Sequence, residues 1–116
     1  MPNLRTESQF GVTTALGVAY TLLYTVPAAT TANVLLNVTN RTTAPALLRA
    51  YVADTSWATG EPTAGTLKAA IAYDRSIAAG EVFQISGIVM TTTQKLIVQS
   101  SVAASLDILV LGVAIT

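Results

Sequence analysis

Apolar and polar residues alternate along several short segments of this chain, and clusters of turn-forming residues separate them at short intervals. A period of two places every second side chain on the same face of a β-strand. Valine, isoleucine, threonine and tyrosine, which favour strands, dominate these segments. The pattern predicts an all-β chain with strands over residues 20–26, 32–39, 46–53, 82–90, 95–102 and 106–116.

The rest of the chain is less regular. Residues 67–77 fit either one strand or a short helical turn, and residues 54–66, rich in glycine, proline and threonine, are predicted to form the chief loop. Residues 1–9 are polar and lie outside the alternating pattern, so we expect an N-terminal arm there, either disordered or laid on a neighbouring subunit. A length of 116 residues fits one domain. We therefore expect an antiparallel β-sandwich, jelly-roll-like, over residues 10–116.

The last two predicted strands are joined by a short turn over residues 103–105, and we expect them to form a hairpin. In the final strand both alternating sets are apolar. A strand that is apolar on both faces must be covered on both, whereas a two-layer sandwich covers only its inner faces. Another subunit is the simplest cover for the second set, which consists of Leu109, Leu111, Val113 and Ile115.

Composition supports self-association. Charged residues make up 10% of the chain and the mean hydropathy is +0.57, whereas ordinary soluble domains are about 25% charged. This is too little charge for a solitary monomer, so we expect a homo-oligomer, for example a trimer. Six basic residues balance six acidic ones, so no net field favours nucleic acid.

A membrane partner is not expected either. Residues 8–40 carry no charge, but Gln9, Pro27, Asn33 and many threonines interrupt them. A spanning helix needs about 20 predominantly apolar residues in a row. The first seven residues lack the basic and apolar regions of a secretory signal. We therefore expect a protein that is made in a cytoplasm and used there, or assembled into a particle there.

The side chains available for chemistry are few. The chain has no cysteine and no histidine, which removes thiolate nucleophiles, the commonest general base and the commonest transition-metal ligand. We expect no enzyme activity, no cofactor and no metal. A glycosidase pair is a weaker hypothesis than turn capping and solvation, because none of the acids form a close pair in sequence; those considered are Asp54, Glu61, Asp74, Glu81 and Asp107. A calcium site built on Asp54, Glu61 and loop carbonyls is weaker than a plain polar loop, because no D-x-D-x-D-G series is present.

Some residues are candidates for an interface. Trp57, the only tryptophan, either anchors a partner or plugs one end of the sandwich. Arg49 marks the solvent or partner face of its strand. The candidate interface comprises Trp57, Tyr51, Arg49, Leu109, Leu111, Val113 and Ile115. A separate hypothesis is a carbohydrate-binding module with stacking platforms at Trp57, Tyr51 and Tyr73.

Several short motifs resemble those of the small β-sandwich structural proteins of tailed bacteriophages. They are LYTVPAATTANV at 23–34, NVTN at 37–40, GE at 80–81, KLIVQSS at 95–101 and GVAIT at 112–116. They occur in the family's order and span residues 20–116. In that family the KLIVQSS strand pairs with GVAIT. A glycine is common at the position of Ala29, so a negative φ is expected for the alanine here.

The resemblance implies a virion structural protein assembled in the host cytoplasm. The first hypothesis is a head decoration or cement protein that oligomerises and stabilises the head by binding the major capsid protein. The alternative is a tail, neck, baseplate or fibre-base component.

Overall fold

The computed structural model describes residues 5–116, with side chains from residue 9 onward. Over this range the chain forms eight strands and no helix, as an all-β pattern predicts. The strands are β1 (Arg5–Leu16), β2 (Thr21–Thr25), β3 (Thr31–Asn40), β4 (Ala46–Ala53), β5 (Leu67–Ile77), β6 (Val82–Met90), β7 (Lys95–Ser100) and β8 (Leu106–Ile115).

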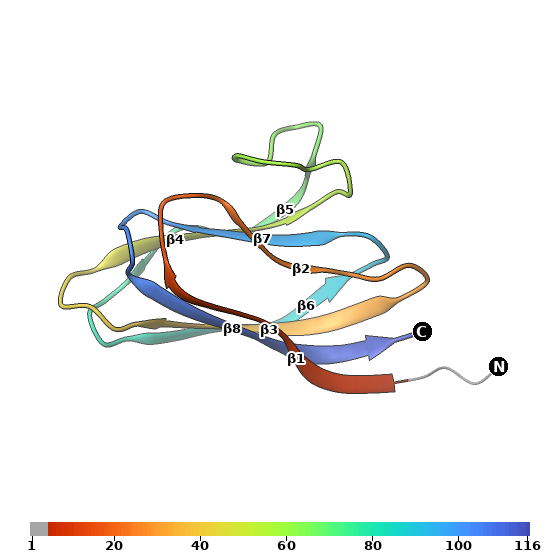
Figure 1. Cartoon of the computed structure of the whole chain (residues 1–116), viewed down its shortest axis with the longest axis horizontal. Helices are drawn as coiled ribbons and strands as arrows, with labels where there is room; N and C mark the ends of the chain where they lie inside the picture. The colour runs from red at the N-terminus through yellow and green to blue at the C-terminus, as the bar shows by residue number, and fades with distance from the viewer. Residues whose placement is uncertain (1–4) are drawn as a thin grey trace.

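The strands form two four-stranded antiparallel sheets. We call the sheet with the order β1-β8-β3-β6 the β8 sheet, and the sheet with the order β2-β7-β4-β5 the β7 sheet. Figure 1 shows them as two layers, with β2, β4 and β7 above β1, β3 and β8. Among the described strands, every connection crosses between the sheets except that from β4 to β5. This is the winding of a jelly roll, and the predicted sandwich is confirmed.

The core lies between the sheets and consists of inward-facing side chains. Buried and more exposed positions alternate along β3, where Val34, Leu36 and Val38 are buried. On β8 the buried set includes Ile108 and Val110. Each fully buried side chain of this size stabilises the fold by about 1.5–3 kcal/mol. One of the two apolar sets of β8 therefore belongs to the core of the chain itself.

One lateral side of the sandwich is closed where β1 passes β2. A Cβ atom on Gly11 would lie 2.6 Å from the backbone oxygen of Leu23, so the close approach requires glycine. Beside it, Phe10 stacks on Tyr24 with ring centroids 4.5 Å apart. The opposite lateral side lies between the edge strands β5 and β6.

β7 and β8 do not form the predicted hairpin. β7 pairs with β2 and β4, whereas β8 pairs with β1 and β3, so residues 101–105 carry the chain from one sheet to the other. The hydroxyls of Ser100 and Ser105 lie 2.6 Å apart at this crossing. A short turn between two apolar strands suits a hairpin and a crossing equally well. The pairing implied by the phage family is wrong here for the same reason.

The predicted N-terminal arm differs from the structure. β1 begins at Arg5 and pairs with β8 from Arg5 opposite Ile115 to Leu16 opposite Leu106. Residues 5–9 therefore belong to the sandwich, and the predicted boundary at residue 10 falls inside a strand. Residues 1–4 lie outside the described residues. Backbone pairing builds this strand, and two register shifts along it break the alternation that a sequence pattern depends on.

The structure also tests two local predictions. Residues 67–77 form a strand and not a helical turn. Ala29 has a φ of 54°, so the expected negative value is wrong. The turn keeps the left-handed conformation for which glycine is the usual choice, although its residue is alanine.

Candidate interaction surface

The second apolar set of β8 lies on the outer face of its sheet, where it was predicted. Leu111 is 38% exposed and Ile115 is 41% exposed, while Leu109 and Val113 are partly buried by their neighbours. No other layer of the described chain packs over this face, since the described strands form two layers. The set is therefore free for contact with another molecule.

Neighbouring strands extend this surface. The register places Val12 of β1 opposite Leu109, Leu35 of β3 opposite Leu111, and Asn33 opposite both Val113 and Val89 of β6. Residues directly opposite each other in an antiparallel pair point to the same face. Val12 is 53% exposed and Val89 is 62% exposed. We define the apolar face as Val12, Leu35, Val89, Leu109, Leu111, Val113 and Ile115.

Uncharged polar groups fill the rest of this surface. Gln84 donates to the side-chain oxygen of Asn37 at 2.8 Å, which pairs the two amides beside the apolar face. A hollow of about 490 Å³ lies among Leu35, Leu111 and Val113. From residue 9 onward, the charged groups near this surface are Arg41 and Asp107, which pair with each other at one end of β8. A partner that covers the middle of the surface therefore need not desolvate this ion pair.

Tyr51 lies on the outer face of the other sheet, and Trp57 packs onto the same face from the chief loop. Trp57 is 7% exposed and packs with Ala53, Ile97 and Tyr20, and its ring nitrogen donates to the oxygen of Gly60 at 2.8 Å. Figure 1 shows the loop between β4 and β5 rising beyond the β7 sheet. The second face of β7 is thus covered by the chain's own loop, whereas the predicted cover for a doubly apolar strand was another subunit.

Tyr51 is 3% exposed, so neither aromatic residue offers a surface to a partner in this structure. Lys95 donates to the backbone oxygen of Trp57 at 2.8 Å and lies 5.9 Å from the centroid of its ring. The loop is therefore fixed to β7 by apolar packing, a hydrogen bond and a cation–π contact.

Arg49 joins the same loop to β4 and β5. Its guanidinium donates to Asp74 at 2.7 and 3.2 Å and to Glu61 at 2.9 Å. It also donates to the hydroxyl of Tyr20 at 3.2 Å and stacks 4.4 Å from the ring centroid of Tyr73. These contacts use all three nitrogens and one face of the guanidinium. Arg49 therefore holds the loop and β5 against β4 within its own chain.

The acids of this cluster stay ionised. The hydroxyl of Tyr51 donates to Glu61 at 2.7 Å, and this bond is the largest cause that lowers the pKa of Glu61, while the charge of Arg49 acts in the same direction. The hydrogen bond from Arg49 lowers the pKa of Asp74. Burial, followed by the bond to Glu61, raises the pKa of Tyr51. Glycosidases need one carboxyl with a raised pKa, and this pair has none.

Acid is expected to weaken the attachment of the loop. The pKa of Glu61 is lower in the folded chain, so its contribution is present above the unfolded value of about 4.3 and is lost as the pH falls through the folded value. With no histidine in the chain, the urea midpoint should stay level from about pH 6 to 8 and fall below about pH 4. Glu61→Gln should lower the midpoint at neutral pH and reduce this fall. An unchanged acid response in that variant would contradict the assignment.

The structure also shows where the residues of the other sequence hypotheses lie. Of the proposed sugar platforms, Trp57 and Tyr51 are buried, and Tyr73 is exposed but has Arg49 against its ring. Asp54 caps the amide of Ser56 at 2.7 Å, a turn role. Within the described residues, no group of three metal-ligating side chains comes together. Over the same part of the chain, no helix has the length and apolar character needed to cross a membrane.

Comparisons with known proteins give a likeness in structure but none in sequence. No protein-family model matches the chain, and no curated protein matches it. One similar solved structure is "Structure of infectious bursal disease virus Gx strain", with 17% identity and a TM-score of 0.42. The likeness covers 98% of this chain and 33% of that chain, so this chain spans about a third of that chain's length. At this level of similarity the likeness carries no argument about function.

Proposed function

We propose that this protein is a non-enzymatic structural subunit of a virus particle, which assembles through the apolar face of the β8 sheet. The observation that carries the proposal is the position of that face. The second apolar set of β7 is covered by Trp57, whereas that of β8 is open to solvent. Large exposed apolar patches on soluble proteins commonly mark interaction sites.

The chemistry of the face indicates the kind of partner. It offers branched aliphatic side chains with neutral amides beside them, so a partner gains apolar burial there. Copies of this chain and a capsid subunit with a similar uncharged patch both fit. The phage-like motifs favour a head decoration or cement protein bound to the major capsid protein, with a tail, neck, baseplate or fibre-base component as the alternative.

Electron microscopy of the assembled particle separates the two virion positions. Density for this sandwich over the whole head surface, with the β8 sheet turned toward the capsid subunits, is expected for decoration. A small ring at the tail axis would indicate the alternative. Density in neither place would contradict a virion role.

Leu111→Lys is expected to weaken assembly. A lysine in the centre of a desolvated patch costs about 2 kcal/mol or more, which is about thirtyfold in affinity. Leu47→Lys is the matched control, because Leu47 is also a leucine with 38% exposure but lies on β4, in the other sheet. Sedimentation velocity should show a smaller species for Leu111→Lys where wild type and Leu47→Lys remain assembled. A wild-type monomer at high concentration would contradict self-assembly.

A further inference from the structure

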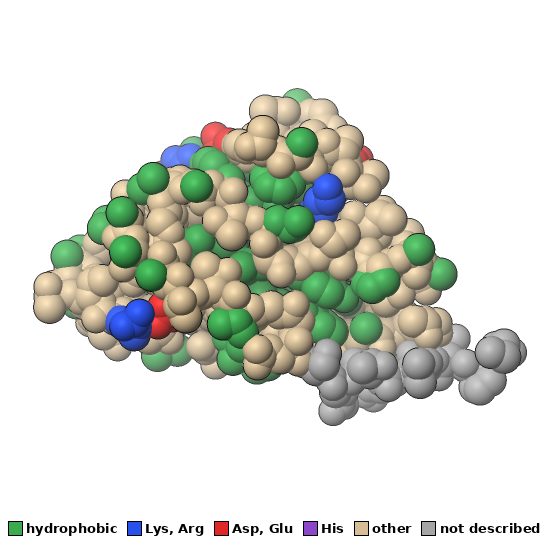
Figure 2. Space-filling view, in the orientation of Figure 1, with side chains coloured by type: hydrophobic (Ala, Val, Ile, Leu, Met, Phe, Trp, Pro, Cys, Tyr) green, Lys and Arg blue, Asp and Glu red, His purple; other side chains and the backbone are tan. Residues whose placement is uncertain are grey.

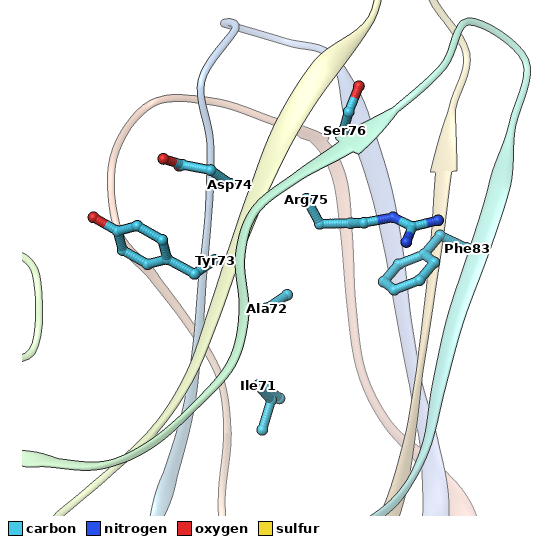
Figure 3. A pocket seen from close by; sticks show the side chains of 7 residues that line it. All are labelled: Ile71, Ala72, Tyr73, Asp74, Arg75, Ser76 and Phe83. Carbon is cyan, nitrogen blue, oxygen red and sulfur yellow. The ribbon is translucent and has the colours of Figure 1, made fainter.

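The lateral side between β5 and β6 is open. A groove of about 610 Å³ runs along it beside Ile71 and Phe83, and a second groove of about 440 Å³ continues from Ile71 toward Ile85 and Val89. Figure 3 shows Arg75 reaching from β5 toward the ring of Phe83, and its guanidinium lies 4.4 Å from the ring centroid. A side chain thus bridges the two sheets here, and the backbones of β5 and β6 are not paired with each other.

Of the edge strands described, β1, β2 and β5 carry features that protect exposed sheet edges. β5 has the charged residues Lys68, Asp74 and Arg75, with a positive φ at Asp74. β2 is 5 residues long and has a register shift. β1 has two register shifts, and the amide of Ala15, beside one of them, donates to Asp107 at 2.9 Å. Charges, short strands and bulges all discourage pairing with another chain.

β6 differs from these edges. It is 9 residues long, has no charged residue, and pairs with β3 on one side only. Its one register shift accompanies Gly87, which has a φ of 73°. The segment from Val82 to Ile85 continues in regular register with β3. A strand of this kind offers unpaired backbone donors and acceptors to a second strand.

We infer that β6 pairs antiparallel with β6 of a second copy through its regular segment, about a two-fold axis near Gln84. The inference deepens the proposed function, because it names a second self-contact beside the apolar face. Identical strands that run antiparallel satisfy both free edges with the same residues, which is an isologous contact. An uncharged strand also meets no like-charge repulsion from its own copy. A strand from a different protein would not be related to β6 by this symmetry.

The geometry of this contact limits the number of copies that it can join. Because the described chain has one unprotected edge, pairing uses it up and gives a closed dimer, not a fibre. The two β8 sheets become one continuous sheet. A two-fold axis perpendicular to the sheet keeps the outer face of each copy on the same side, so the two apolar faces lie side by side and remain available.

Cross-linking tests this contact directly, because the chain has no cysteine of its own. Single cysteines at Gln84, Ser86 and Val89 are oxidised under mild conditions, and covalent dimer is followed on non-reducing gels. Ser101→Cys is the matched control for Ser86→Cys, since both are exposed serines and Ser101 lies in the crossing after β7. At least one β6 position should cross-link about tenfold faster than the control, since neighbouring strands place paired Cβ atoms about 4.5–5.5 Å apart.

The same cross-links in a Leu111→Lys background separate the two proposals. Fast β6 cross-linking there supports edge pairing independently of the apolar face. If Leu111→Lys disrupts assembly and no β6 cysteine exceeds the control, the proposed function stands and edge pairing is overturned. If wild type is monomeric as well, both proposals fail. Gln84→Lys provides a second check: two lysines meeting across the axis should abolish the dimer without affecting folding, because Gln84 is exposed.

Discussion

Replacing Trp57 by alanine is expected to lower the free energy of unfolding by about 3 kcal/mol, the lower part of the range for buried tryptophan. The indole covers Ile97, which is fully buried, and it is the main apolar contact between the loop and the β7 sheet. Its removal opens the outer face of β7 to water. Urea denaturation followed by circular dichroism measures the change.

Trp57→Phe provides the control for this prediction. It keeps an aromatic ring over Ile97 but removes the donor to Gly60, so it should cost about 1 kcal/mol for the hydrogen bond and part of the packing. Wild-type unfolding can be followed by the fluorescence of the single tryptophan. If Trp57→Ala weakened assembly and left the stability of the monomer unchanged, Trp57 would be an interface anchor after all.

Gly112→Ala is expected to destabilise the fold by about 3 kcal/mol, the upper part of the usual range for overpacking. A Cβ atom at this position would overlap the backbone oxygen of Asn33 and would lie 3.0 Å from the Cα atom of Val34. β3 cannot move away easily, because it is hydrogen-bonded to β8 on one side and to β6 on the other. The added Cβ atom would also lie 2.8 Å from a ring carbon of Phe10.

Gly65→Ala is the matched control for Gly112→Ala. Nothing lies within 4 Å of a Cβ atom at Gly65, and it belongs to the exposed loop. This change should shift stability by less than about 0.5 kcal/mol. Equal urea midpoints for the two variants would mean that β8 and β3 are not packed as closely as the structure has them.

The sequence pattern predicted best the strands that turn-forming residues bound on both sides. β4 and β6 have the predicted ends, because such residues precede and follow each of them. β1 was missed, since bulges interrupt its alternation and much of it is polar. The prediction of a hairpin between β7 and β8 was wrong, because the composition of a turn does not indicate which sheet the next strand joins.

The candidate surface was predicted in part. Leu109, Leu111, Val113 and Ile115 were placed together by alternation along a single strand, which needs no knowledge of the fold. Val12, Leu35 and Val89 were missed, because their membership depends on the pairing register.

The ion pairs of Arg49 were missed for a similar reason. Asp74 is 25 residues away along the chain, and the pairing of β4 with β5 brings it to the guanidinium. Trp57 was predicted either to anchor a partner or to plug one end of the sandwich, whereas it packs on the outer face of β7 in its own chain.

The order of the strands also affects how the protein is made. β8 is the last of the eight strands in the sequence, yet it lies between β1 and β3. While the chain is being synthesised, β1 and β3 have no common neighbour and their apolar positions stay uncovered. Pairing between such distant segments is slow and leaves the chain prone to aggregation. The β8 sheet can therefore close only after β8 has left the ribosome, so a copy cannot join an assembly through this sheet before that point.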